Sequence, residues 1–219
     1  MDENHRDHQK QNKSCKYVAV AGNIGAGKSS LTGLLAKHFR WKAYYETVDS
    51  NPYLSDFYED MRRWSFNLQI FFLSSRFRNQ RNMLEKQTHI IQDRTIYEDA
   101  EIFAKNLHEM GLISDRDYHN YKILYNEIVT FLRPPDLLIY LKAEVSTLVR
   151  QIQQRGRDYE SLIRIEYLER LNNLYEDWIQ NYPHEKLIID TDDLDYVNNE
   201  EDLGKVIELI DQRLYGLFN

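Results

Sequence analysis

The sequence reads Gly22-Asn23-Ile24-Gly25-Ala26-Gly27-Lys28-Ser29 at the point that decides its fold, a complete match to the phosphate-binding pattern G-x-x-x-x-G-K-[ST]. The apolar run Tyr17–Ala21 precedes this loop, and a segment of helical composition, Ser30–Phe39, follows it. A strand, a loop and a helix in this order form the context in which the pattern binds a nucleoside triphosphate. A glycine-rich turn that matches by accident is the alternative, and both flanking elements disfavour it.

The residue types of this loop explain why it binds phosphate. Glycines let backbone N–H groups turn toward phosphate oxygens, and the N-terminus of the following helix adds a partial positive charge. Lys28 can reach the β- and γ-phosphates, and the hydroxyl of Ser29 suits a magnesium ion. We expect the triphosphate to contact the loop and the residue after it: Gly22, Asn23, Ile24, Gly25, Ala26, Gly27, Lys28, Ser29 and Ser30.

The composition narrows the class of partner. A length of 219 residues suits one α/β domain with a substantial core, over residues 16–219. The formal net charge of -7 disfavours nucleic acid, because proteins that follow a phosphate backbone carry a basic face. No apolar run approaches the roughly 20 residues of a membrane span, and residues 1–15 are predicted to be a disordered polar tail, not a signal peptide. Cys15 is the only cysteine, which fits a cytoplasmic location.

Short apolar runs alternate with segments of helical periodicity along the chain. The predicted strands are Tyr17–Ala21, Ala43–Glu46, His89–Asp93, Asp136–Leu141 and Lys186–Asp190. The predicted helices between them include Trp64–Leu84, Glu98–Leu107, Asp115–Leu132, Thr147–Gln154 and Leu162–Asn181, with Ser114 and Ser146 as N-caps. Strands that alternate with helices predict an α/β fold with a five-stranded parallel sheet and helices on both faces.

Charged residues stand at the predicted ends of two strands. Ligands of open parallel sheets bind beyond the carboxyl ends of the strands, so Glu46 and the pair Asp93-Arg94 are expected to face the phosphate loop. A carboxylate there can take a proton from an acceptor hydroxyl or hold the water shell of a metal ion, and an arginine can hold a phosphoryl group. The same residues can also be ordinary solvated charges, and spacing alone leaves both interpretations open.

Two further segments carry candidate binding residues. Arg155 and Arg157 flank a glycine at a predicted helix end, where they can form a closing lid over the phosphates or merely interact with the helix dipole. On the helix from Trp64, two polar residues share a largely apolar face with Phe72 and Leu73. These are Gln69, which suits a two-point contact with a heterocyclic base, and Arg76. Spacing alone favours the other interpretation, in which this face of the helix packs in the core and Arg76 lies at the solvent boundary.

Taken together, these segments resemble the deoxynucleoside kinase family from about Lys16 to the C-terminal region. The marks, in matching order, are Gly22–Ser29, Glu46, Asn51-Pro52-Tyr53-Leu54, Arg63-Trp64-Ser65-Phe66, Asp93-Arg94-Thr95, Tyr97-Glu98-Asp99 and Arg155-Gly156-Arg157. The resemblance implies a P-loop kinase fold and a homodimer that transfers the γ-phosphate of ATP, with Mg²⁺, to the 5′-hydroxyl of a deoxynucleoside. The Asn-Pro-Tyr-Leu stretch and the Asp before Arg94 are closer to bacterial purine-type members, so deoxyadenosine or deoxyguanosine is the expected acceptor.

The resemblance also implies a role for each matching residue. Glu46 matches the general base, Arg94 matches the arginine that holds the 5′-hydroxyl and the incoming phosphoryl group, and Asp93 is expected near the magnesium. The other matches are Gln69 as the base reader, Arg76 and Asp99 as a polar pair, Phe103 as the stacking ring, Tyr58 and Glu160 at the 3′-hydroxyl, and Arg155 and Arg157 in the lid. Base selectivity is expected to depend on the pocket shape around Gln69, Phe72, Leu73 and Asp99.

Two other functions are weighed against this one. A nucleoside monophosphate kinase of the thymidylate type shares the fold but needs further cations for the phosphate of its acceptor. A GTP-driven switch needs an Asp-x-x-Gly loop and an Asn-Lys-x-Asp guanine reader, and the sequence contains neither.

Overall fold

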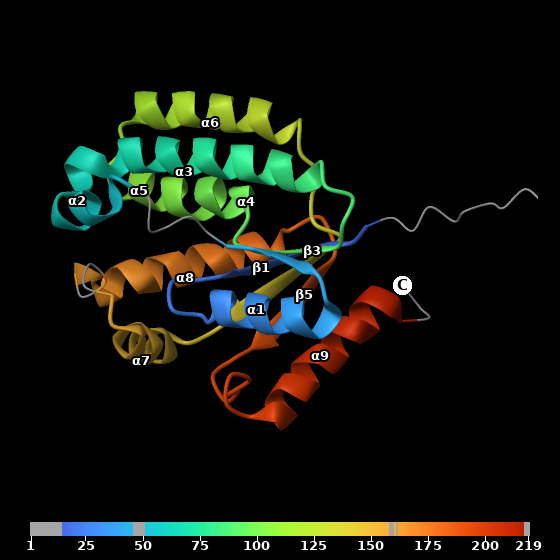
Figure 1. Ribbon diagram of the computed structural model, residues 1–219. Helices are drawn as coiled ribbons and strands as arrows, with labels where there is room; N and C mark the ends of the chain where they lie inside the picture. The colour runs from blue at the N-terminus through green and yellow to red at the C-terminus, as the bar shows by residue number, and fades with distance from the viewer. Residues whose placement is uncertain (1–14, 46–50, 158–159, 161, 217–219) are drawn as a thin grey trace, which may run out of the picture.

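A five-stranded parallel sheet forms the centre of the computed structural model, which describes residues 15–45, 51–157, 160 and 162–216 (Figure 1). Its strands are β1 (Tyr17–Gly22), β2 (Lys42–Tyr44), β3 (Ile90–Asp93), β4 (Leu137–Lys142) and β5 (Lys186–Asp190). They lie in the order β2-β3-β1-β4-β5, so β1 pairs with β3 on one side and with β4 on the other. The strand that leads into the phosphate loop is therefore central, and the predicted parallel α/β fold is confirmed.

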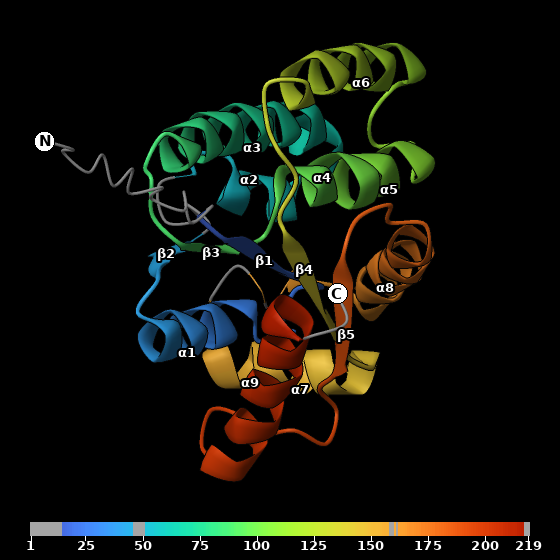
Figure 2. The ribbon, with the colours of Figure 1, turned by 90° about the vertical axis from the view of Figure 1, so that its right-hand side faces the viewer.

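Helices cover both faces of this sheet. They are α1 (Lys28–Phe39), α2 (Leu54–Glu59), α3 (Met61–Leu84), α4 (Ile96–Glu98), the π-helix η1 (Asp99–Ala104), α5 (Lys105–Glu109), α6 (Asp115–Val129), α7 (Val145–Arg155), α8 (Ile165–Gln180) and α9 (Glu200–Tyr215). Figure 2 shows α3, α4, α5 and α6 on one side of the sheet and α1, α7 and α9 on the other. None of the helices in the described ranges is long and apolar enough to cross a membrane.

The alternation of side chains along β1 explains the two layers. Tyr17, Ala19 and Ala21 belong to one buried cluster, which they share with side chains of α3, α5 and α8. Val18 and Val20 belong to a second cluster, which they share with side chains of α1, α7 and α9. Successive side chains of a strand point to opposite faces, and here both faces are apolar, as expected for a central strand of a parallel sheet.

Several predicted boundaries differ from the structure. Ser146 is not an N-cap: α7 begins at Val145 with Glu144 as its N-cap, whereas Ser114 caps α6 as predicted, by accepting a hydrogen bond from the backbone N–H of Asp117. The single helix predicted over Glu98–Leu107 is instead divided among α4, η1 and α5. The helices α2 and α9 were not predicted. Residues 1–14 of the tail predicted over residues 1–15 lie outside the described residues.

Candidate active site

The phosphate loop runs from the end of β1 to the start of α1, and its conformation depends on glycine. Gly25 and Gly27 have φ angles of +86° and +85°, which side chains rarely tolerate. A Cβ atom at Gly25 would also lie 2.8 Å from the backbone oxygen of Leu148. The Nζ of Lys28 donates to the backbone oxygen of Asn23 at 2.8 Å, and the Asn23 amide donates to the backbone oxygen of Leu168 at 3.0 Å. The loop is therefore packed against α7 and tied to α8.

The two residues expected near magnesium lie together. The Oγ of Ser29 donates a hydrogen bond to Oδ2 of Asp93, which is 3% exposed. The other carboxylate oxygen, Oδ1, is buried without a hydrogen-bond partner among the described residues. Mg²⁺ in phosphoryl-transfer sites is held by one or two protein oxygens together with water and phosphate oxygens. One hydroxyl and one carboxylate with an unused oxygen fit such an ion, although the described residues contain no group of three His, Cys, Asp or Glu side chains that could hold a metal by themselves.

A cavity of about 310 Å³ lies beside the phosphate loop and contains most of the predicted acceptor residues. Its lining includes Ile24, Gly25, Lys28, Ser29, Tyr58, Gln69, Phe72, Asp93, Arg94, Asp99, Phe103, Arg155, Arg157 and Glu160. We call it the acceptor cavity. Arg76 lines an adjoining cavity of about 260 Å³, which also includes Phe72 and Asp93. Glu46, the predicted general base, lies outside the described residues.

Gln69 is the clearest sign that a ligand belongs in the acceptor cavity. Its side chain extends from α3 and is 2% exposed, and its Oε1 has no hydrogen-bond partner among the described residues. A buried polar atom without a partner costs about 1–3 kcal/mol of folding free energy. A ligand that donates a hydrogen bond to this oxygen would remove that cost. Leu73, by contrast, was wrongly expected to shape the pocket, because it packs in a separate apolar cluster with Tyr121 and Tyr125 of α6.

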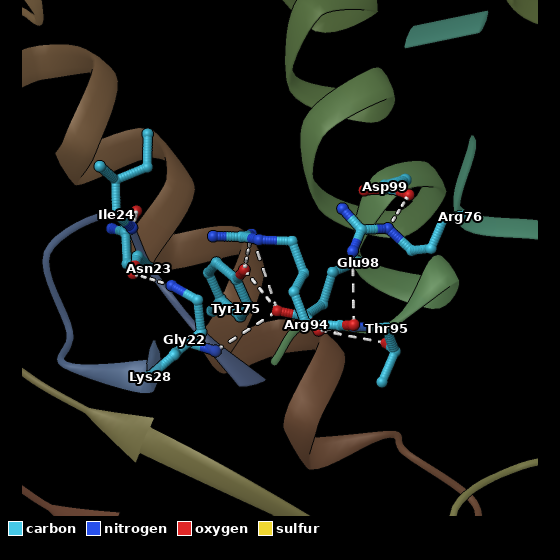
Figure 3. Close-up of polar contacts among 10 residues, drawn as sticks. All are labelled: Gly22, Asn23, Ile24, Lys28, Arg76, Arg94, Thr95, Glu98, Asp99 and Tyr175. Atoms are coloured by element: carbon cyan, nitrogen blue, oxygen red, sulfur yellow. Dashed lines mark hydrogen bonds and ion pairs between the residues drawn. The ribbon is translucent and has the colours of Figure 1, made fainter. Parts of the chain in front are cut away.

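Arg76 and Asp99 form the polar pair that the sequence predicts. The Nε of Arg76 donates to Oδ2 of Asp99 at 2.5 Å, and Nη1 donates to the backbone oxygen of Arg94 at 3.4 Å (Figure 3). Arg76 is 6% exposed and Asp99 is 2% exposed, so a place at the solvent boundary is ruled out. Asp99 and Phe103 both lie in η1, and such π-helical turns are frequent at functional sites.

Arg94 follows β3 in a strained backbone conformation. Its φ angle is +64°, in the left-handed region, where a residue other than glycine costs about 1–3 kcal/mol. The Nη1 atom donates to the hydroxyl of Tyr175 at 2.8 Å, and the guanidinium lies 4.5 Å from the centre of the Phe103 ring. Arg94 as a whole is 4% exposed. Arg94 is therefore a buried cation whose direction is fixed by its neighbours.

The two predicted lid arginines converge on one carboxylate. Arg155, the last residue of α7, donates to Glu160 from Nε at 3.0 Å and from Nη2 at 2.6 Å. Nη1 of Arg157 lies 3.5 Å from Oε1 of the same Glu160. Glu160 is 4% exposed, whereas the two arginine side chains are 35% and 38% exposed. The lid thus joins its cations to the residue predicted to bind the sugar.

A third hollow, of about 670 Å³, also borders the phosphate loop. It is lined by Gly27, Lys28 and Ser29, by Arg150 and Gln151 of α7, and by residues 192–198, which follow β5. Tyr196 from this segment is 5% exposed and approaches the phosphate loop, since its hydroxyl lies 3.4 Å from the backbone oxygen of Ala26. Its position beyond the carboxyl end of a strand was the one available sequence signal for this segment, which was not predicted as part of the site.

Glu98 and Tyr175 contact Arg94, and neither was predicted as a functional residue. Both are fully buried, and the hydroxyl of Tyr175 donates to Oε1 of Glu98 at 2.8 Å. The spacing Thr95-x-x-Glu98 matches a capping box, which the structure forms. That signal could have located Glu98, whereas no local pattern links it to Tyr175 on α8.

Known proteins resemble this chain over most of its length. A family model described as deoxynucleoside kinase matches residues 18–214. The deoxyadenosine/deoxycytidine kinase of Bacillus subtilis (strain 168) is 41% identical over 198 residues, which cover 88% of this chain and 90% of that protein. The deoxyadenosine kinase of Lactobacillus acidophilus is 37% identical over 218 residues, 93% of this chain and 99% of that protein.

Solved structures agree with these sequence relatives. The deoxyadenosine kinase from M. mycoides with bound dATP has a TM-score of 0.80 at 30% identity, over 90% of this chain and 99% of that one. A second structure of that kinase, with the products dCMP and a flexible dCDP bound, has a TM-score of 0.81 at 32% identity over the same shares of the two chains.

Proposed function

This chain belongs to the deoxynucleoside kinase family, and from that premise we propose that its preferred acceptor is a purine deoxynucleoside, deoxyadenosine or deoxyguanosine. The protein is an ATP-dependent deoxynucleoside kinase, which transfers the γ-phosphoryl group of ATP to the 5′-hydroxyl. Family membership disfavours a monophosphate kinase and a GTP-driven switch. The observation that carries the binding of a base is the buried, unpartnered Oε1 of Gln69 in a cavity that also contains Arg94 and part of the phosphate loop. The deoxyadenosine and deoxyguanosine kinases among the relatives support the choice of a purine.

Gln69 reads the base through the two ends of its amide. An amide offers one acceptor and one donor group, and so it can pair with the amino group and the adjacent ring nitrogen of adenine. Cytosine presents the same order of donor and acceptor, which makes deoxycytidine a second acceptor, in keeping with the name of the Bacillus subtilis relative. Asp99 can accept from the amino group of either base, and Arg76 can donate to the O6 atom of guanine. Phe103 stacks on the base, and Phe72 shapes the cavity beside it.

Tyr58 and Glu160 hold the 3′-hydroxyl of the sugar. Both side chains line the acceptor cavity, and the buried Glu160 pairs with two partly exposed arginines. When ATP binds, Arg155 and Arg157 turn part of their hydrogen bonding toward the phosphates. Both arginines are partly exposed and share one carboxylate, so either can turn toward a phosphate while the other stays paired with the buried Glu160.

Phosphoryl transfer depends mainly on alignment and on neutralisation of charge. Lys28 and the loop amides hold the β- and γ-phosphates, and Arg94 aligns the 5′-hydroxyl with the transferring group. Glu46 takes the proton from that hydroxyl, a role that rests on the family motif since the residue lies outside the described part of the chain. Ser29 and Asp93 are the residues that would hold Mg²⁺, which when bound supplies positive charge to the phosphate oxygens.

The enzyme forms a homodimer through the outer face of α6. Three large apolar side chains there are unusually exposed: Ile123 by 50%, Leu124 by 45% and Phe131, just beyond the helix, by 74%. In Figure 1, α6 lies on the outside of the molecule, beyond α3. Light scattering of the wild type is expected to give the mass of two chains, and Leu124→Glu is expected to give the mass of one. A wild type that stays monomeric at micromolar concentration would exclude this dimer.

The acceptor assignment is tested with a panel of substrates. The four deoxynucleosides and the four ribonucleosides are each offered with ATP and Mg²⁺, and acceptor-dependent release of ADP is measured. We expect the highest kcat/KM for deoxyadenosine or deoxyguanosine, then deoxycytidine, and low values for ribonucleosides. A preference for thymidine would overturn the base assignment, and release that no nucleoside increases would overturn the function.

A further inference from the structure

We propose that Glu98 and Tyr175 are positioning residues, which hold the guanidinium of Arg94 in a fixed position relative to the phosphate loop. The inference rests on the proposed function, because the direction of Arg94 matters for the reaction only if this residue aligns the acceptor hydroxyl. Neither side chain lines the acceptor cavity, so both act through Arg94.

The carboxylate of Glu98 joins three parts of the site. Its Oε2 accepts from the backbone N–H of Thr95 at 2.7 Å and from the Thr95 hydroxyl at 3.1 Å. Its Oε1 accepts from the hydroxyl of Tyr175 at 2.8 Å and from the backbone N–H of Gly22 at 3.4 Å (Figure 3). Gly22 is the first residue of the phosphate loop, and Thr95 directly follows Arg94. One carboxylate therefore connects the donor side of the site with the acceptor side.

Tyr175 is the link between this carboxylate and Arg94. Nη1 of Arg94 donates to the Tyr175 hydroxyl at 2.8 Å, whereas its direct distance to Oε1 of Glu98 is 3.7 Å. A hydroxyl has one donor hydrogen and two acceptor lone pairs, so it can accept from Arg94 and donate to Glu98 at once. Burial raises the pKa of Tyr175 well above its usual 10, which keeps the proton on the oxygen. The Arg94–Tyr175–Glu98 chain thus has a fixed direction of donation.

Packing alone does not account for these two polar groups. The Tyr175 ring stacks on Tyr140 at 5.7 Å and meets the Phe103 ring edge-on at 6.5 Å, contacts that need no hydroxyl. A fully buried carboxylate is costly to desolvate, and an apolar residue of similar size is often the more stable choice in a core. Arg94 also has an unfavourable φ angle that the surrounding contacts must maintain. The Tyr175 hydroxyl, the buried Glu98 carboxylate and the φ angle of Arg94 all serve to direct the guanidinium of Arg94.

Tyr175→Phe is the test variant, because it removes the linking hydroxyl and keeps the ring. Tyr140→Phe is the matched control: this buried tyrosine stacks on Tyr175, but its hydroxyl donates to Glu176 at 3.1 Å, outside the acceptor cavity. For Tyr175→Phe we expect kcat to fall about tenfold, with a change in deoxynucleoside KM below about threefold, since a small misplacement of an aligning group costs mainly the chemical step. Tyr140→Phe is expected to retain kcat within about twofold.

Three measurements decide the outcome: kcat and KM for deoxyadenosine with ATP and Mg²⁺, calorimetric binding of deoxyadenosine, and the melting temperature. Glu98→Gln, which keeps the shape but removes the charge, is expected to lower kcat at least as much as Tyr175→Phe. The inference is overturned if Tyr175→Phe matches Tyr140→Phe in kcat, or if both lose kcat in proportion to their melting temperatures. A wild type without acceptor-dependent turnover would instead refute the proposed function, and the inference with it.

Discussion

The acceptor cavity and the arginine lid hold their cations in opposite ways. Arg76 and Arg94 beside the cavity are 6% and 4% exposed, and neighbouring carboxylate, hydroxyl and backbone oxygens fix their directions. The side chains of Arg155 and Arg157 in the lid are 35% and 38% exposed and share Glu160. A buried charge that is already paired needs no reorganisation during the reaction, whereas a partly exposed arginine can move to another partner. The cations of the acceptor side are therefore fixed before substrate binds, whereas we expect the arginines of the proposed lid to rearrange.

Replacing Arg94 with lysine is expected to give the largest effect. Lysine keeps the positive charge but lacks the planar set of donors that lets one side chain meet both Tyr175 and a substrate oxygen. We expect kcat to fall about 1,000-fold, equal to about 4 kcal/mol, which lies at the lower end of the effects attributed to arginines in phosphoryl transfer. Steady-state kinetics with deoxyadenosine measures this loss.

The matched control for Arg94→Lys is Arg133→Lys. Arg133 pairs with Asp136 at 3.1 Å near the start of β4, away from the acceptor cavity. It is expected to retain kcat within about twofold, as surface substitutions usually do. If Arg94→Lys also kept its kcat, positive charge alone would suffice there and the fixed geometry of the acceptor side would have no catalytic value.

Removing the carboxylate of Asp99 tests the preorganised side through stability. Asp99→Ala leaves Arg76 buried without its partner at 2.5 Å, and breaking such a pair typically costs about 3–5 kcal/mol. We expect a loss of about 3 kcal/mol in the free energy of unfolding, measured by urea denaturation of the protein without ligand. Lys205→Ala, which removes exposed ion pairs of α9, is the control and is expected to change little. Equal losses in the two variants would contradict the contrast between buried and exposed pairs.

A smaller effect is expected in the lid. Arg155→Gln removes one cation that can turn toward the phosphates and leaves Arg157 in place, so we expect kcat to fall about tenfold, with a rise in the KM for ATP. The control is Arg81→Gln, which breaks an exposed pair between Arg81 of α3 and Glu85, just beyond that helix, away from the acceptor cavity. A loss as large as that of Arg94→Lys would show that the lid, too, acts as a fixed group.

Local sequence patterns account for the parts of this molecule that are contiguous. The phosphate loop was predicted because its glycines, Lys28 and Ser29 follow one another between a strand and a helix. The Arg76–Asp99 pair is different, because its members lie on separate elements, and it was predicted through the family resemblance. Asn199 and the acidic first turn of α9 formed a usable start signal for a helix that was not predicted.

The wrong expectation for Leu73 and the missed contact between Tyr175 and Glu98 have physical causes as well. Gln69 and Leu73 are four residues apart on α3, and helical spacing places them on one side without showing where the cavity ends and the core begins. Leu73 packs against side chains of α6, whereas Gln69 lines the acceptor cavity. Tyr175 and Glu98 are separated by 77 positions. They meet because α8 packs beside η1, which directly follows Glu98. Such contacts depend on tertiary packing, which no local pattern contains.

The last prediction concerns Gln69. Its replacement is expected to change stability less than that of Asp99, and to raise it where Asp99→Ala lowers it. Gln69 is as buried as the paired groups around it, yet its Oε1 has no partner among the described residues. Gln69→Leu replaces the amide with an apolar side chain of similar size, so the protein without ligand should become more stable by about 1 kcal/mol. Deoxyadenosine binding should weaken at least tenfold, because the base would lose both contacts that we propose for the amide. Thermal unfolding with and without deoxyadenosine measures the two effects together. A variant that is less stable and still binds deoxyadenosine would mean that Gln69 serves the fold and that the base is recognised by Arg76 and Asp99 alone.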